Sequence, residues 1–175
     1  RTALDKADVI QAIYADMYPD GVSGGATRLP FNPLCSECGR IGTTRGTSWD
    51  AERGVISYVC RSDIASYTDP ESGQQVFIPG CGHQGERSPF AGGGKFPWKV
   101  EWAAKWITKG VIAEWAGKDH FSAGGSRAAA CRISVEVFGY PPPYPSAGVR
   151  TGNGYEFLQV GGRKMSTSKG SGVGF

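Results

Sequence analysis

The sequence predicts an α/β protein whose later half forms a parallel sheet covered by helices, preceded by a small cysteine-bearing insert. Between residues 97 and 160, helix-period and strand-like stretches alternate. Before them lies a turn-rich stretch that carries four cysteines and lacks helical periodicity. Hydrophobic residues make up 39% of the chain, enough for a packed core, while 27 glycines and 11 prolines among 175 residues indicate many loops.

The first two segments are expected at residues 1–32, a helical lead-in, and 33–88, the insert. A helix is predicted from Ala3 to Tyr18, because apolar residues recur there at helical spacing and Pro19 follows. Within the insert, short strands are predicted at 39–44, 55–60 and 75–78.

The third segment, residues 89–175, carries the alternating pattern. Helices are predicted at Pro97–Lys109, with Gly110 just past its end, and at Ser126–Phe138. Their buried positions are expected to be Val100, Ala103, Trp106 and Ile107 in the first helix, and Ala129, Ala130, Ile133 and Val137 in the second. Strands are predicted at 111–115 and 155–160. Ligands of parallel sheets bind beyond the carboxyl ends of the strands, which points to the loops that begin at Gly117 and Gly161.

Four of the five cysteines have spacing suited to a metal. Cys35 and Cys38 form a Cys-x-x-Cys turn followed by glycine, and Cys60 and Cys81 complete the set. Four thiolates, or three with the His83 imidazole, would hold a structural Zn²⁺, and reduced cysteines without metal are the alternative. The odd number and the Cys-x-x-Cys pair argue against a secreted disulfide scaffold and favour a cytoplasmic location. The fifth, Cys131, is expected in the core.

The stretch from Gly161 to Gly170 combines glycines, three basic residues and three hydroxyl residues. Its backbone could close around a polyphosphate while lysines neutralise the charge of a leaving pyrophosphate. A solvated basic tail is the alternative for this composition.

Within that stretch, Lys164-Met165-Ser166-Thr167-Ser168-Lys169 resembles the second ATP signature of class I aminoacyl-tRNA synthetases, commonly Lys-Met-Ser-Lys-Ser. Further blocks are similar, in order, to the class I (archaeal-type) lysyl-tRNA synthetases over about four-fifths of the chain. These blocks are residues 35–41, 81–85, 93–106, 110–111, 117–120, 124–126, 136–142 and 155–158.

The resemblance implies a fold and a reaction. The fold would be the second half of a class I synthetase Rossmann-like nucleotide-binding domain, carrying a zinc-ribbon-like insert. The reaction would be ATP- and Mg²⁺-dependent activation of lysine to lysyl-adenylate, followed by transfer to tRNA(Lys). The resemblance also implies roles for residues: Lys164 and Lys169 would stabilise phosphate charge, and Ser166 and Ser168 would hold the loop.

For the substrate pocket, the resemblance implies that Trp98 forms a wall and Glu101 pairs with the substrate ammonium. Asp119, His120 and Met165 would lie at the adenosine or amino-acid site. Simpler interpretations stay open: Glu101 as a solvated helix residue, His120 as a loop hydrogen-bonder, and both Trp102 and Trp106 as core.

The first ATP signature of the family, of the His-Ile-Gly-His type, does not occur in this sequence. We therefore expect an internal fragment that is inactive alone, from a monomeric parent with no membrane association. Two alternatives remain: a zinc-ribbon module that binds nucleic acid, and a class I synthetase of the glutamyl or glutaminyl kind.

Overall fold

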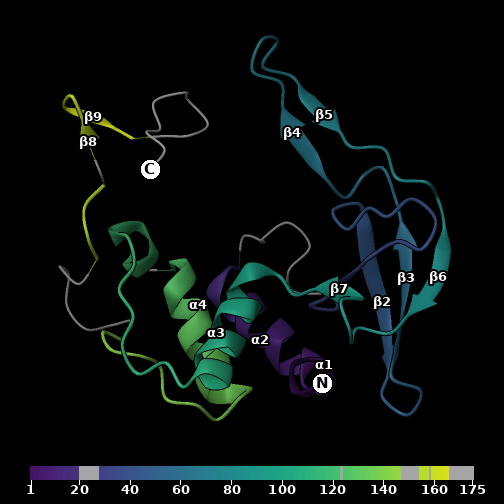
Figure 1. Cartoon of the computed structure of the whole chain (residues 1–175), viewed down its shortest axis with the longest axis horizontal. Coiled ribbons are helices and arrows are strands. Elements are labelled where there is room, and N and C mark those ends of the chain that lie inside the picture. Colours follow the sequence, from purple (N-terminus) through teal and green to yellow (C-terminus); the bar gives the residue numbers. More distant parts are fainter. Residues whose placement is uncertain (20–27, 123, 147–153, 158, 166–175) are drawn as a thin grey trace.

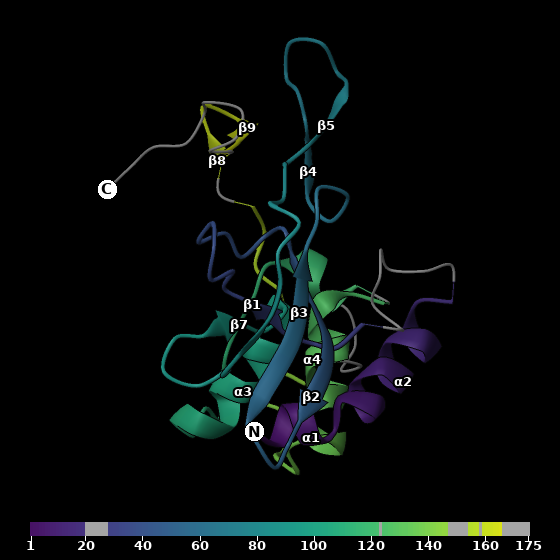
Figure 2. The same ribbon diagram turned by 90° about the vertical axis from the view of Figure 1, so that its right-hand side faces the viewer.

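The computed structural model describes residues 1–19, 28–122, 124–146, 154–157 and 159–165. Figures 1 and 2 show a helical part beside a part built of strands. The helices are α1 (Thr2–Asp5), α2 (Ala7–Met17), α3 (Trp98–Lys109), the 3-10 helix η1 (Lys118–Phe121) and α4 (Ser126–Glu136). The strands are β1 (Asn32–Pro33), β2 (Thr44–Asp50), β3 (Val55–Cys60), β4 (Ser66–Thr68), β5 (Gln75–Phe77), β6 (Gln84–Arg87), β7 (Gly94–Lys95), β8 (Gln159–Val160) and β9 (Arg163–Lys164).

The main core lies between α2, α3 and α4, which pack together in Figure 1. The buried positions predicted for α4 are confirmed: Ala129, Ala130, Ile133 and Val137 are each at most 1% exposed. In α3 the prediction holds for Val100, Ala103 and Trp106 but is wrong for Ile107, which is 40% exposed. Ile107 lies one position past Trp106, about 100° further around the helix, and so falls off the buried face.

The predicted first helix is two helices. The backbone at Lys6 leaves helical geometry, with φ −112° and ψ 33°, so α1 ends at Asp5 and α2 starts at Ala7. The Lys6 ammonium donates a hydrogen bond of 2.8 Å to the carbonyl of Val137, just past the end of α4. This break lets Leu4 pack in a second cluster, against Leu29, Phe31 and Ile56 of the strand-rich part, while α2 stays in the helical core.

The strand-rich part is antiparallel throughout. β2, β3 and β6 form one sheet, β4 and β5 a projecting hairpin, and β1 pairs with β7. The hairpin extends away from the rest of this part in both views (Figures 1 and 2). The prediction for β3 is confirmed, whereas the strand predicted at 39–44 is wrong because β2 begins only at Thr44. The chain before it turns at Gly39, whose φ of 68° suits glycine, and the Cys35 amide donates to the Arg40 carbonyl.

The predicted parallel sheet is not found among the described residues, whose four sheets are all antiparallel. Where the structure describes the chain, parallel pairing is limited to two isolated bridges, Ala113 with Tyr144 and Gly117 with Tyr155. Both partners bond to the same edge of the extended segment after α3, because Ile112, Glu114, Ala116 and Lys118 supply its peptide groups. Within the described residues, no helix has the length and apolar character needed to cross a membrane.

Candidate functional site

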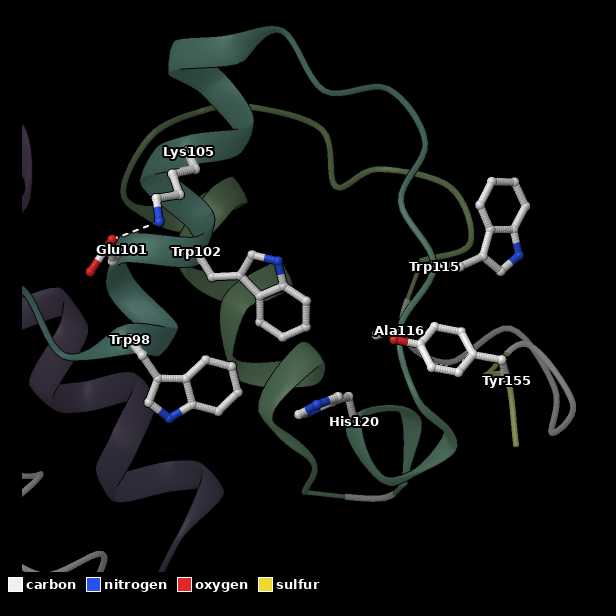
Figure 3. A pocket seen from close by; sticks show the side chains of 8 residues that line it. All are labelled: Trp98, Glu101, Trp102, Lys105, Trp115, Ala116, His120 and Tyr155. Atoms are coloured by element: carbon white, nitrogen blue, oxygen red, sulfur yellow. Dashed lines mark ion pairs between the residues drawn. The ribbon is translucent and has the colours of Figure 1, made fainter. Parts of the chain in front are cut away.

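A cleft of about 380 Å³ lies between the first half of α3 and the extended segment that follows that helix (Figure 3). Eight residues line it: Trp98, Glu101, Trp102, Lys105, Trp115, Ala116, His120 and Tyr155. Four come from α3, two from the extended segment, one from η1 and one from the segment bridged to Gly117. Most of the wall is aromatic.

Helix α3 places its aromatic residues by simple periodicity. Trp98, Trp102 and Trp106 follow one another at four-residue spacing and therefore lie along one face. The Trp98 and Trp102 rings stack at a centroid distance of 5.4 Å, and the His120 ring lies 5.6 Å from each. Trp106, only 1% exposed, belongs to the core, whereas Trp102 is half-buried and reaches the cleft. The interpretation of Trp102 as core is therefore incomplete.

The acidic group in the cleft already has a partner. The Glu101 carboxylate lies 2.7 Å from the Lys105 ammonium, one turn further along α3; the Lys105 side chain is exposed and that of Glu101 is partly exposed. A pair in this setting exchanges readily with a competing cation, because water screens it. The cleft thus combines stacked rings with an accessible carboxylate, a set of groups that attracts an ammonium ion.

Lys164 lies on the same side of the molecule as the loop that carries Asp119. The ammonium groups of Lys118 and Lys164 lie 5.5 Å and 3.3 Å from the centroid of the Phe157 ring. Lys118 also pairs with Glu156, at 2.6 Å. Lys118 of η1 and Lys164 of β9 therefore both contact the Phe157 ring, which belongs to the segment that precedes the β8–β9 hairpin.

The other residues expected at the site lie outside the cleft wall or outside the described part of the chain. Asp119 is exposed and Met165 half-buried, and neither lines the cleft. Ser166, Ser168 and Lys169 lie outside the described residues.

Sequence reasoning missed five residues of the cleft wall: Trp102, Lys105, Trp115, Ala116 and Tyr155. The four-residue step from Trp98 could have indicated Trp102, and the same step from Glu101 could have indicated Lys105. Trp115 and Tyr155 gave no such signal, because long-range pairing of their segments brings them to the cleft.

The second candidate site is the cysteine cluster. The Sγ atoms of Cys35, Cys38, Cys60 and Cys81 all lie within 4.8 Å of one another. Sγ of Cys35 lies 3.6 Å from that of Cys81, and Sγ of Cys38 lies 3.8 Å from that of Cys60. Zn–S bonds of about 2.3 Å give a tetrahedron with edges of about 3.8 Å, so these atoms fit zinc closely.

Electrostatics at the cluster favour a thiolate at Cys35. Burial alone would raise its pKa, but backbone N–H groups of Cys38 and Glu37 and the neighbouring thiols outweigh burial and lower the pKa to about 6. The pKa of Cys60 is also lowered; burial opposes this, and the Thr43 hydroxyl and the Cys81 amide favour it. At Cys81 the His83 amide lowers the pKa, yet burial and the other thiols together raise it to about 12. A cation at the centre would relieve this competition for protons.

His83 stands beside the cluster and is not one of its four grouped ligands. Its Nε2 atom lies 3.1 Å from the Ser36 hydroxyl, and its ring packs at 5.9 Å from Tyr58. The Tyr58 hydroxyl accepts a hydrogen bond from the Ser36 amide inside the Cys-x-x-Cys turn. His83 and Tyr58 therefore brace the turn that presents Cys35 and Cys38.

Comparison with known proteins places the chain in a family. The family model described as "tRNA synthetases class I (K)" matches residues 1–175. A lysine–tRNA ligase of Methanosarcina barkeri (strain Fusaro) is 39% identical over 171 residues, covering 97% of this chain and 26% of that protein. The lysine–tRNA ligase of Archaeoglobus fulgidus is 38% identical, covering 97% of this chain and 28% of that protein. For the ligase of Methanopyrus kandleri the identity is 40%, over 80% of this chain and 24% of that protein.

The chain thus spans about a quarter of the length of these relatives. The similarity runs through both sites described above, the cleft on α3 and the cysteine cluster. The chain belongs to the family of class I tRNA synthetases for lysine.

Proposed function

We propose that this chain is part of a lysine–tRNA ligase and contributes the pocket for the amino acid. One observation carries the proposal: the aromatic cleft holds a partly exposed carboxylate, and Tyr155 of its wall lies two residues before Phe157, the ring that Lys164 contacts. Lysine has a cationic side chain, which stacked indole rings and Glu101 would attract. The relatives are themselves named lysine–tRNA ligases, which favours this function over a nucleic-acid-binding zinc module or a glutamyl-type synthetase.

In the proposed reaction, the lysine carboxylate attacks the α-phosphate of Mg²⁺-bound ATP. Lysyl-adenylate forms, pyrophosphate leaves, and the lysyl group then passes to tRNA(Lys). Lys164 and Lys169 would stabilise charge on the phosphates, with Ser166 and Ser168 holding the loop. Trp98 would form a wall of the amino-acid pocket, and Asp119, His120 and Met165 would contact the adenosine or amino-acid part of the adenylate. These groups act by position and charge.

The proposal extends to the organisation of the chain. We assign a helical lead-in to 1–32, a zinc-binding insert to 33–88, and the second half of a Rossmann-like domain to 89–175. The two parallel bridges beside η1 support the last assignment. Cys35, Cys38, Cys60 and Cys81 would hold Zn²⁺, which cross-links the insert and leaves no open coordination position for chemistry.

Calorimetric titration of the chain with free amino acids tests the pocket. Lysine should bind, and glutamate should bind at least about tenfold more weakly, because its side-chain carboxylate is repelled by Glu101 and gains no cation–π contact with the indole rings. Trp98→Ala should weaken lysine binding by about tenfold, a typical cost for a lost aromatic contact to a cation. Trp49→Ala is the matched control, since Trp49 lies on β2 and does not line the cleft. Equal binding of lysine and glutamate would refute the proposal.

A further inference from the structure

Arg127 is a charged residue in the middle of the helical part. It lies on the first turn of α4, and its side chain is 0% exposed. Burying a guanidinium is costly unless its charge and its N–H groups find partners. The groups that contact this buried cation are therefore expected to be held in place by it.

Two of its contacts fix the proline-rich segment that follows α4. The Arg127 Nε–H donates to the Pro145 carbonyl at 3.1 Å, and Nη2 donates to the Pro143 carbonyl at 3.2 Å. Between these prolines, the Tyr144 carbonyl accepts a hydrogen bond of 2.9 Å from the Glu114 amide. The guanidinium thus fixes the backbone to which Glu114 is bonded.

The remaining contacts fix the Glu114 side chain. Nη1 of Arg127 lies 3.5 Å from Oε2 of Glu114 and has no hydrogen-bond partner among the described residues. The guanidinium carbon lies 4.9 Å from the Phe121 ring centroid, 5.2 Å from that of Trp106 and 5.7 Å from that of Trp102. Arg127 therefore forms an ion pair with Glu114 and cation–π contacts with the three rings.

Glu114 connects Arg127 to the wall of the cleft. Its Oε2 atom accepts hydrogen bonds from the indole N–H groups of Trp102, at 2.8 Å, and Trp106, at 2.6 Å. Trp102 lines the cleft and stacks on Trp98, which lines it as well. A shift of the Glu114 carboxylate would therefore rotate or release the ring that forms the back of the cleft (Figure 3).

We infer that Arg127 is a positioning residue for this cleft, acting through Glu114 and the Trp102 ring without touching the ligand. The inference deepens the proposed function and rests on it for the identity of the ligand. The orientation of the Trp102 ring is inferred from the contacts of Arg127 and Glu114 and does not depend on the identity of the ligand.

The first test uses near-ultraviolet circular dichroism, which reports the packing of indole rings and requires no ligand. Arg127→Met keeps most of the side-chain volume and removes the charge. Its aromatic signal should change while the far-ultraviolet spectrum stays as in the wild type. Ile133→Val, in the same helix core, is the matched control for general loosening and should keep the aromatic signal. An unchanged signal in Arg127→Met overturns the inference.

The second test measures lysine affinity by calorimetry. Arg127→Met should weaken binding by about tenfold, because Trp102 loses its fixed orientation. Arg127→Lys keeps the charge and should recover part of this loss. Ile133→Val and the surface variant Arg132→Met should stay within about twofold of wild type. Equal weakening in Arg127→Met and Ile133→Val would indicate a purely structural role and overturn the inference.

Two further comparisons cover a variant that does not fold and a wild-type chain that does not bind lysine. If Arg127→Met does not fold, Glu114→Gln replaces it, because this variant keeps the shape of the side chain and removes the charge that faces Arg127. It should change both readouts in the same direction, and wild-type behaviour in both would overturn the inference. If the wild-type chain binds no lysine, the proposed function fails, and the near-ultraviolet comparison still decides the role of Arg127.

Discussion

At the scale of single residues, Glu101, the proposed partner of the lysine ammonium, already has a partner within the chain. Its carboxylate pairs with Lys105, and the two side chains are 40% and 63% exposed. An exposed pair of this kind contributes at most about 1 kcal/mol, so a ligand ammonium can displace Lys105 at small cost.

This competition leads to a prediction for Lys105→Met. Removing the competing ammonium frees Glu101, and lysine affinity should rise by up to about fivefold in a titration. Adding Glu101→Gln to this variant should abolish the gain. Lys109→Met, one turn further along α3, should leave affinity unchanged. A weaker affinity in Lys105→Met would instead mean that the Lys105 ammonium binds the carboxylate of the lysine ligand.

The positions of some site residues were predictable from sequence where a local motif carried them. Trp98, Glu101 and His120 were expected at one site by resemblance, and all three line the cleft. Tyr155 and Trp115 were missed because their positions depend on pairing between distant segments, which leaves no periodic pattern. Arg127 was missed for another reason: composition predicts an arginine at the surface, and only its surrounding rings and carbonyls explain its burial.

At the scale of elements, the proposed insert is a thin sheet, and we expect its stability to depend on the cysteine cluster. Its strands bury few large side chains, chiefly Ile56, Tyr58 and Cys60 of β3. A structural zinc contributes about 10–16 kcal/mol in small domains of this kind, far more than such a core supplies.

Metal removal should therefore unfold the insert and spare the helices. Elemental analysis should find one zinc ion per chain. A strong chelator, or Cys38→Ser, should abolish protection from hydrogen exchange in β2, β3 and β6 while α3 and α4 stay protected. Cys131→Ala should keep the metal, because Cys131 lies in the helical core. Full protection of β3 in a metal-free sample would contradict this prediction.

The β4–β5 hairpin provides a prediction about pH. One Asp69 carboxylate oxygen accepts backbone N–H groups from Glu71, at 2.9 Å, and Ser72, at 2.8 Å. The amides of Ser72 and Glu71 hold the pKa of Asp69 below its ordinary value of 3.8. Because the pKa of Asp69 is lower in the folded than in the unfolded state, its ionised carboxylate stabilises the hairpin above about pH 4. This stabilisation is lost as pH falls through the folded pKa. The Ile78 amide donates to the Ala65 carbonyl, and its protection from hydrogen exchange, corrected for the pH dependence of the intrinsic exchange rate, should fall on acidification. Asp69→Asn should show the lower protection already at neutral pH. Glu71→Gln is the control and should behave as wild type.

Elements were predictable where periodicity was undisturbed. α3, α4 and β3 follow their patterns closely. The break at Lys6 and the late start of β2 were not predictable, because both depend on tertiary contacts: the Lys6 ammonium with Val137, and the cysteine turn before Thr44. The alternation of helices and strands correctly indicated mixed α/β structure. The parallel sheet that it also predicted is not found, since only two isolated parallel bridges form among the described residues.

At the scale of the whole molecule, the extended segment after α3 has one occupied and one open edge. Ile112, Glu114, Ala116 and Lys118 bond to Tyr144 and Tyr155 on one side. On the opposite side, the peptide groups of Ala113 and Trp115 have no partner within the described residues. Ile112 is 82% exposed and Trp115 57% exposed, so the segment presents apolar side chains and free peptide groups together. Such an edge suits a further strand.

The open edge and the length of the relatives lead to one prediction about activity. The 175-residue chain covers about a quarter of the lysine–tRNA ligases that it matches, and it has no His-Ile-Gly signature. Lysine-dependent exchange of pyrophosphate into ATP should therefore stay at background for the chain alone, even if lysine binds.

A longer protein that adds the sequence aligned with the start of those ligases should show exchange, and the Ala113 and Trp115 amides should then exchange hydrogen slowly. Lys164→Ala in the longer protein should reduce the exchange rate by about a hundredfold or more, as expected for a residue that stabilises transition-state charge. Robust exchange by the 175-residue chain would show that one ATP signature is sufficient and that the open edge is not where the nucleotide site is completed.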